Sequence, residues 1–109
     1  MKDSPKYKLI KIFTDEDAKH RGRPIFETII EFLSSHHCQC RCVVSRAIAG
    51  CNEKGHISNR NILTLSTHMP LIIHIIVPQE KFDTVQKELV TMVTEGVITV
   101  EDITVLNKQ

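Results

Sequence analysis

Hydrophobic and polar residues follow two different periods along this chain. Apolar side chains lie on both faces of an extended segment from Tyr7 to Thr14, and again from Leu71 to Val77, where the run LIIHIIV is strongly β-prone. After Pro24 and after Pro78, apolar residues instead recur every three or four positions, as on one face of an amphipathic helix. Proline suits the first turn of a helix because its missing N–H has no partner to lose there. The pattern therefore predicts two strands and two helices.

Two further strands complete the pattern. The segment Cys38 to Ile48 predicts the second strand, and the last is placed at Asp102 to Leu106, after Gly96 as the expected helix stop. The order is then strand, helix, strand, strand, helix, strand, which is the ferredoxin-like βαββαβ arrangement of an α+β domain. Such a domain has a four-stranded antiparallel sheet with two helices on one face. We expect a single domain over residues 1–109, with residues 1–6 as a flexible N-terminus.

The second face of the predicted sheet has no helix to cover it. Two helices cover only one face of a four-stranded sheet, yet the first and third strands also carry apolar residues toward the other face. A monomer would then expose a larger apolar patch than the few hundred Å² that soluble monomers usually show. We therefore expect a closed cyclic oligomer in which another copy covers this face.

Composition and charge exclude several functional classes. Fourteen Lys and Arg against thirteen Asp and Glu give a net charge of +1, which creates no global field to attract nucleic acid. No apolar run approaches the roughly 20 residues of a membrane-spanning helix, and the polar N-terminus is not a secretory signal. We therefore expect a cytoplasmic protein that does not span a membrane and does not bind nucleic acid. Its four cysteines are expected to be thiols.

Three of the cysteines alternate with other residues in the sequence HHCQCRC. On a strand Cys38, Cys40 and Cys42 would share one face, with neighbouring residues about 6.6–6.8 Å apart. A tetrahedral zinc site needs sulfur atoms about 4 Å from one another, since each lies about 2.3 Å from the metal. Small buried thiols are thus the favoured interpretation, and no metal site is expected. Cys38 and Cys40 remain the only metal candidates.

Basic residues gather at two places where an anion could bind. The first place precedes the first helix, whose free backbone N–H groups favour negative charge. The second is the loop between the second and third strands, where glycine allows close backbone approach to a phosphate group. The residues concerned are His20, Arg21 and Arg23 in the first place, and Arg46, Gly50, Lys54 and Gly55 in the second. No nucleophile or acid–base pair can be assigned, so we expect a protein that is not an enzyme.

Five stretches of the chain together resemble a known family. They are KLIKIFTDED, HRGRPIFETIIE, VVSRAIAG, MPLIIHIIV and VTEGVITVEDITV. In order and spacing they are similar to domain-of-unknown-function family 190, whose members belong with the PII-like signalling proteins. The similarity covers the chain from about Tyr7 to Leu106.

The resemblance implies a ferredoxin-like subunit in a homotrimer that binds an adenine nucleotide (AMP, ADP, ATP or cyclic AMP) between subunits. It also implies that the loop 47–61 signals to a partner, such as a membrane transporter or a regulated enzyme. By position, Arg46 and Gly50 match the family's residues at the start of this loop, and Gly22 lies in its helix-start pattern. Where the family tends to have R-G-I-x-G-F-G, this chain has RAIAGCN. Asn52 replaces a glycine there and tolerates positive φ better than most residues, so we include it among the candidate ligand-binding residues.

Two alternatives from other classes remain at this point. A CutA-like or metal-responsive trimer would use the Cys and His residues of the chain. An RNA-binding protein with the same strand order would display aromatic residues on the open sheet face. The chain has only one Tyr and four Phe, so RNA binding is the least favoured of the three functions considered.

Overall fold

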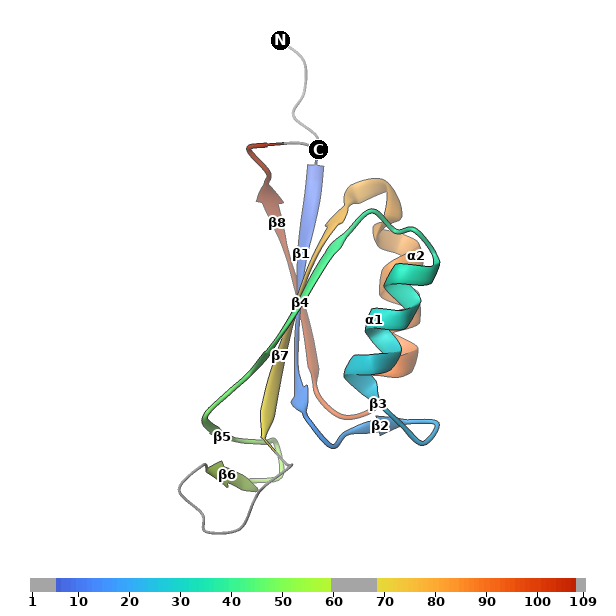
Figure 1. Cartoon of the computed structure of the whole chain (residues 1–109). Helices are drawn as coiled ribbons and strands as arrows, with labels where there is room; N and C mark the ends of the chain where they lie inside the picture. Colours follow the sequence, from blue (N-terminus) through green and yellow to red (C-terminus); the bar gives the residue numbers. More distant parts are fainter. Residues whose placement is uncertain (1–5, 60–68, 108–109) are drawn as a thin grey trace.

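The computed structural model of the protein describes residues 6–59 and 69–107. Its elements in chain order are β1 (Lys6–Asp15), β2 (Lys19–His20), β3 (Arg23–Pro24), α1 (Ile25–Ser35), β4 (Arg41–Arg46), β5 (Ala49–Cys51), β6 (Ile57–Asn59), β7 (Pro70–Pro78), α2 (Gln79–Met92) and β8 (Val97–Thr104). Four strands form an antiparallel sheet in the order β4-β7-β1-β8, and both helices cover the same face of it (Figure 1). The predicted ferredoxin-like α+β fold is confirmed.

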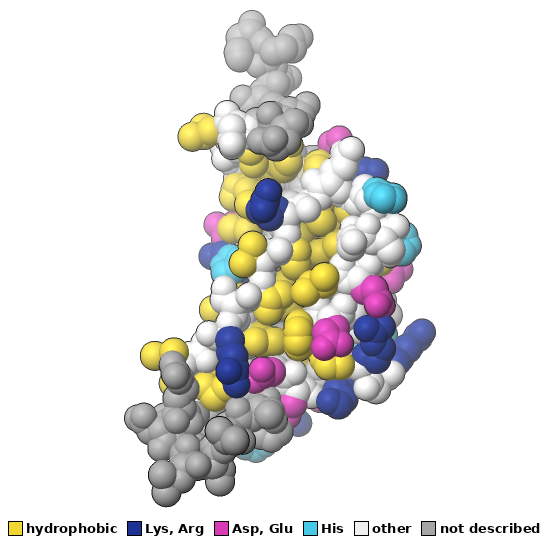
Figure 2. Space-filling view, viewed as in Figure 1, with side chains coloured by type: hydrophobic (Ala, Val, Ile, Leu, Met, Phe, Trp, Pro, Cys, Tyr) yellow, Lys and Arg dark blue, Asp and Glu magenta, His cyan; other side chains and the backbone are white. Residues whose placement is uncertain are grey.

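The core lies between the helices and the two central strands. Direct cross-strand partners such as Ile10 and Ile75, or Ile12 and Ile73, point toward the helices and are fully buried. The helices meet them with residues at helical spacing, among them Ile29 of α1. Figure 2 shows the hydrophobic side chains gathered along the line where sheet and helices meet. Burying each such side chain contributes about 1.5–3 kcal/mol, which makes this layer the main source of stability.

The opposite side of the sheet carries no helix (Figure 1), and we call it the open face. Because side chains alternate along a strand, it presents Leu9, Lys11 and Phe13 from β1, Ile72, His74 and Ile76 from β7, Val43 from β4, and Val97 and Glu101 from β8. Phe13 is 42% exposed and Val43 is 49% exposed. The second apolar face predicted from the sequence is therefore present.

Edge strand β8 is held to β1 by charged pairs as well as by backbone hydrogen bonds. Lys8 Nζ donates to Asp102 Oδ1 at 2.6 Å on the helix side of the sheet. Lys11 Nζ lies 3.5 Å from Glu101 Oε1 on the open face. Both carboxylates are exposed, so solvent screens these pairs and they contribute little to stability beside the backbone hydrogen bonds.

The predicted boundaries of two strands are wrong. Strand β4 begins at Arg41 rather than Cys38, because His37 and Gln39 adopt positive φ angles of 49° and 57° that no strand allows. It ends at Arg46 rather than Ile48. The last strand is Val97–Thr104 rather than Asp102–Leu106, since pairing with β1 starts directly after the turn that follows α2.

The helix ends also differ from the prediction. Pro24 and Pro78 are N-cap residues, one position before the first helical turn. Helix α2 ends at Met92, so Gly96 is not its stop but a residue of the turn into β8, with φ of +136°. Within the described residues, no helix is long and apolar enough to cross a membrane.

Two small hairpins lie at the end of the sheet where β1 ends and β7 begins (Figure 1). The β2–β3 hairpin lies on the helix side, and the β5–β6 hairpin lies toward the open face. The loop predicted at 47–61 thus contains two strands of its own, and its last residues lie outside the described part of the chain, as do residues 1–5. Lys6, predicted to belong to the flexible N-terminus, is the first residue of β1.

Candidate functional site

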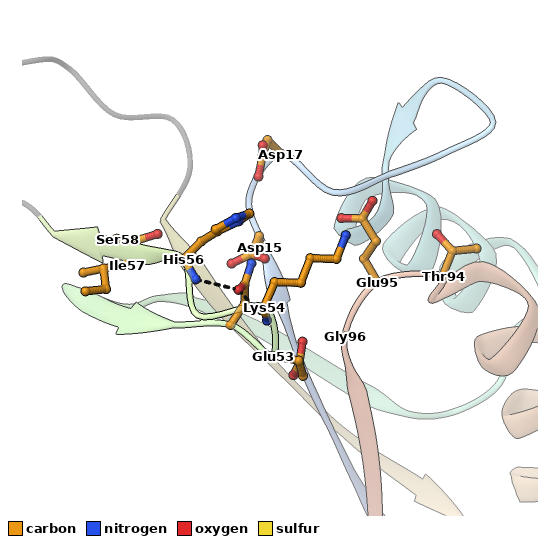
Figure 3. A pocket seen from close by; sticks show the side chains of 11 residues that line it. Asp15, Asp17, Glu53, Lys54, His56, Ile57, Ser58, Thr94, Glu95 and Gly96 are labelled. Atoms are coloured by element: carbon orange, nitrogen blue, oxygen red, sulfur yellow. Dashed lines mark hydrogen bonds between the residues drawn. The ribbon is translucent and has the colours of Figure 1, made fainter.

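A cleft of about 660 Å³ opens where the β5–β6 hairpin faces the end of β1 and the turn between α2 and β8. Asp15 continues the alternation of Phe13 and Lys11 along β1, so the cleft begins at the end of the open face. Its charged or polar lining residues are Asp15, Asp17, Asn52, Glu53, Lys54, His56, Ser58, Thr94 and Glu95 (Figure 3). We refer to it below as the cleft.

The tip of the β5–β6 hairpin is built around Asn52. Its side-chain Oδ1 accepts hydrogen bonds from the backbone N–H groups of Lys54 and His56, each at 3.0 Å. The backbone closes the turn with Gly55 N–H donating to Asn52 O at 2.9 Å, and Gly55 supplies the positive φ of 83° that this turn needs. The turn therefore fixes the backbone from which Lys54 and His56 reach into the cleft (Figure 3).

The base of the hairpin is fastened to the sheet. Ala47 N–H donates to Pro70 O at 2.8 Å, and Gly50 lies so near Pro70 that a Cβ would come within 3.0 Å of its Cγ. Arg46 Nε donates to Glu16 Oε1 at 3.2 Å, on the helix side of the sheet. The hairpin is thus anchored to the sheet at its base.

The opposite wall is fixed by a contact between β1 and the turn before β8. Thr14 is buried, and its Oγ1 donates to Glu95 O at 2.7 Å. Gly96 packs directly on the backbone of Phe13, with no space for a side chain. The backbone of Glu95 is therefore fixed at the end of β1, and its side chain lines the cleft (Figure 3).

Among the described residues that line the cleft, carboxylates outnumber basic groups. They are Asp15, Asp17, Glu53 and Glu95 against Lys54 and His56. The pKa of Asp15 is raised above its ordinary value, first by burial and then by the negative charges of Asp17, Glu53 and Glu95, while His56 acts in the opposite direction. The described part of the lining therefore favours positive over negative charge.

Removing the charge of Asp15 should stabilise the protein at neutral pH. Because its folded-state pKa is raised, the folded protein holds this proton more tightly than the unfolded chain does. The stability that protonated Asp15 contributes is fully present below the ordinary pKa of 3.8, and it is lost as the pH rises through the raised pKa of the folded state. Asp15→Asn should therefore raise the melting temperature at pH 7 by about 2–4 °C, measured by calorimetry.

Asp102→Asn is the matched control for that substitution. The pKa of Asp102 is lowered, because Lys8 donates a hydrogen bond to it and attracts its negative charge. The stability that ionised Asp102 contributes is present above its ordinary pKa and is lost as the pH falls through the lowered pKa. Asp102→Asn should therefore show no stabilisation at pH 7. An equal rise for both variants would contradict the account of Asp15.

The structure brings only part of the predicted anion site into the cleft. Asn52 and Lys54 line it, and the oxygen of Asn52 is already used by the turn. Gly50 and Gly55 belong to the same hairpin but shape its backbone instead of lining the cleft. Arg46 lies at the base of the hairpin, paired with Glu16.

The other predicted group, residues 20–23, lies outside the cleft in the β2–β3 hairpin. Arg21 and Gly22 form its two-residue turn, both with positive φ. Arg23 Nη1 donates to Glu31 Oε1 at 2.7 Å, and the first helical N–H, that of Ile25, donates to Ala18 O at 2.9 Å. Figure 2 shows Lys and Arg side chains gathered at this end of the molecule, on the helix side.

The acidic wall of the cleft was not predicted from the sequence: Asp15, Asp17 and Glu95 are not among the predicted site residues. The signal that could have found them is topological. In a ferredoxin-like sheet, one end of the sheet brings together the last residues of the first strand and the first residues of the third and fourth strands. The acidic residues at those positions therefore face the loop that leads to the third strand.

The cysteines form no metal site in the part of the chain that the structure describes, where no group of three or more His, Cys, Asp or Glu residues could hold an ion. Cys38 is buried in the core, and Cys40 and Cys42 pack against it. Burial raises the pKa of the Cys40 thiol to about 11 and also raises the pKa of Cys42. Both thiols are therefore neutral at physiological pH.

Known proteins share both the sequence pattern and the fold. The model of the DUF190 family (Uncharacterized ACR) matches residues 7–105. A UPF0166 protein from Aquifex aeolicus (strain VF5) is 31% identical over 101 residues, covering 93% of this chain and 94% of that protein.

Two solved structures resemble the protein in fold. One is CPII, a nitrogen regulatory PII-like protein from Thiomonas intermedia K12 bound to ADP, AMP and bicarbonate. It has a TM-score of 0.65 at 17% sequence identity, over 92% of this chain and 88% of that one. The other, the de novo designed protein Foldit4, has a TM-score of 0.52 at 10% identity, over 94% of this chain and all of that one. At these identities the likeness concerns the fold alone.

Proposed function

The chain belongs to the DUF190 family, and from that premise we propose that it is a non-enzymatic, trimeric regulatory protein. It binds an adenine nucleotide (AMP, ADP, ATP or cyclic AMP), or a similar small anionic ligand, between subunits. It passes the signal to a partner protein, a membrane transporter or an enzyme, through the loop 47–61. The observation that carries this proposal is the half-exposed apolar open face, which ends at the cleft in a PII-like fold.

The open face supports the trimer. Its central strands present two apolar pairs, Leu9 with Ile76 and Phe13 with Ile72, on either side of Lys11 and His74. Soluble monomers rarely leave so many large apolar side chains partly exposed on one face. A second copy packed on this face would also stand beside Asp15, at the mouth of the cleft. The cleft thereby becomes a pocket between subunits, which is where ligand sites commonly form.

The ligand class is supported by the PII-like neighbour and limited by the charges of the cleft. CPII was solved with ADP, AMP and bicarbonate bound. In this chain, Lys54 and His56 alone do not offset the carboxylates around them. We assign the remaining positive charge to Arg46 at the base of the hairpin, and to His20 and Arg21 at the rim of a subunit.

The β5–β6 hairpin has the surface expected of a region that contacts another protein. Ile48 is 67% exposed and Ile57 is 76% exposed, although both are large and apolar. Apolar side chains at the centre of protein interfaces typically provide much of the binding energy. Their placement on a projecting hairpin supports the assignment of loop 47–61 to partner recognition.

Ligand binding should be visible as a rise in melting temperature. A ligand that binds only the folded protein stabilises it by about 2.7 kcal/mol at one hundred times its dissociation constant. We expect at least one of AMP, ADP, ATP and cyclic AMP to produce such a shift. Arg46→Ala should weaken that ligand's affinity about tenfold, as expected for loss of one hydrogen bond from a charged group.

Lys87→Ala is the matched control, because Lys87 is also basic and exposed but lies on α2, away from the open face and the cleft. It should leave ligand affinity unchanged, by calorimetric titration. No thermal shift with any of the four nucleotides would overturn the nucleotide assignment. A shift that persists undiminished in Arg46→Ala would remove Arg46 from the site.

A further inference from the structure

A second pocket, of about 970 Å³, lies at the opposite end of the sheet from the cleft. It forms where β1 and β4 begin and where β7 and β8 end. Figure 1 shows this end of the sheet at the top of the view, where the chain turns after β8. We call it the far pocket, and its described lining includes Tyr7, Arg41, Ile76, Pro78 and Val105.

Much of the described lining of the far pocket is apolar. Ile76 and Pro78 come from the end of β7, and Val105 is the first residue after β8. Pro78 is buried, whereas Ile76 and Val105 are half-buried. Tyr7 is the direct cross-strand partner of Pro78 and is also half-buried. Pockets that bind small molecules typically combine such apolar walls with a few polar groups.

Two hydrogen-bond donors in the far pocket have no partner among the residues that the structure describes. Arg41 lies on the open face, opposite Ile76, and its guanidinium forms no hydrogen bond or ion pair there, whereas Arg23 and Arg46 each pair with a glutamate. The Tyr7 hydroxyl also forms no hydrogen bond within the described chain. A guanidinium fork matches the two oxygens of a carboxylate, and a phenol hydroxyl can donate to the same group.

The charges of the described lining fit a ligand with a single negative charge. Lys6 and Arg41 are basic and Glu80 is acidic, so two positive charges stand against one negative charge. Burial raises the pKa of the Cys40 thiol to about 11 and also raises the pKa of Cys42, so neither thiol repels an anion at neutral pH. A phosphate monoester carries about −1.5 to −2 at pH 7. A carboxylate, with one charge, fits this lining better.

We propose that the far pocket binds a small organic monocarboxylate with an apolar body. The carboxylate accepts hydrogen bonds from the Arg41 guanidinium and the Tyr7 hydroxyl. The apolar body packs on Ile76, Pro78 and Val105. All of these groups belong to one subunit, and the site shares no described lining residue with the cleft.

Titration of the isotope-labelled full-length protein with hydrocinnamate, followed by NMR, tests the proposal. Hydrocinnamate carries a phenyl ring on a short chain with one carboxylate. We expect saturable shifts at the amides of Tyr7, Arg41 and Ile76, and none at Gly96 in the wall of the cleft. The neutral amide of the same acid should bind about tenfold more weakly, because it cannot form a charge-assisted pair. Inorganic phosphate at the same concentration should give no saturable shift at these residues.

Variants of the two donors test their roles. Arg41→Ala should weaken hydrocinnamate binding about tenfold, and Arg41→Lys, which keeps the charge but not the fork, should have intermediate affinity. Tyr7→Phe should weaken binding about threefold, as expected for loss of one hydrogen bond from a neutral group. Lys87→Ala, on α2, is the matched control and should bind as the wild type does. Unchanged spectra outside the far pocket would show that each variant is folded.

Four results would overturn the proposal. They are no saturable shift with hydrocinnamate, equal affinity for the acid and its amide, equal affinity for phosphate, and undiminished affinity in Arg41→Ala. Binding by Phe13→Asp but not by the wild type would also overturn it, because a neighbouring copy on the open face would then fill the pocket. The titration uses neither nucleotide nor partner protein, so its result is independent of the function proposed above.

Discussion

Gly96→Ala is expected to destabilise the folded protein by about 3 kcal/mol or more, the sum of backbone strain and steric overlap. The residue has φ of +136°, a region that side-chain-bearing residues rarely adopt. A Cβ there would lie 2.4 Å from Phe13 O and 3.1 Å from Thr14 Cβ, and neither neighbour can move without disturbing β1. Chemical denaturation at fixed protein concentration would measure the loss, with a melting temperature lower by on the order of 15 °C.

Gly22→Ala separates the two contributions. Gly22 also has a positive φ, +81°, but no atom lies within 4 Å of the position its Cβ would occupy. Gly22→Ala should therefore lower the free energy of unfolding only by the cost of backbone strain, about 1–2 kcal/mol. Equal losses for the two variants would show that contact with β1 adds nothing at Gly96.

Phe13→Asp should convert the proposed trimer into monomers. Phe13 is 42% exposed in a single subunit, so the subunit itself should remain folded. Covering the open face with a second copy would instead bury an unpaired carboxylate, at a cost of several kcal/mol for each copy. Light scattering should report a mass near 12.4 kDa for the variant, against three times that mass for the wild type.

Ile30→Asp controls for the effect of an added surface charge. Ile30 is 44% exposed, almost the same as Phe13, but it lies on α1, away from the open face. This variant should keep the wild-type mass. If Phe13→Asp kept it as well, the open face would not be the surface through which subunits meet.

The periodicity of hydrophobic residues was sufficient to predict the fold, because its clearest patterns lie in the two central strands and the two helices. The segments around Ile10 and Ile73 form adjacent strands, and helices follow Pro24 and Pro78 as expected. Boundaries were harder to predict. Nothing in the composition of HHCQCRC indicates that His37 and Gln39 turn the backbone to positive φ, because both residues also occur in strands.

The candidate site was predicted only in part, for a physical reason. A basic loop can be recognised along the sequence, and Lys54 does line the cleft. The acidic wall comes from the ends of β1 and α2, whose proximity depends on strand order and not on sequence distance. Sequence alone could not indicate that Asn52 uses its side-chain oxygen within the turn, or that Arg46 is paired with Glu16.

The charged pairs of β8 have a further consequence. An eight-residue strand at the edge of a sheet is a template onto which other chains can add, and repeated addition of this kind leads to fibrils. Glu101 and Asp102 place adjacent negative charges in the middle of this edge, one toward each side of the sheet. A stacked copy would bring those charges against their own counterparts. Addition of further copies along the β8 edge is thereby disfavoured.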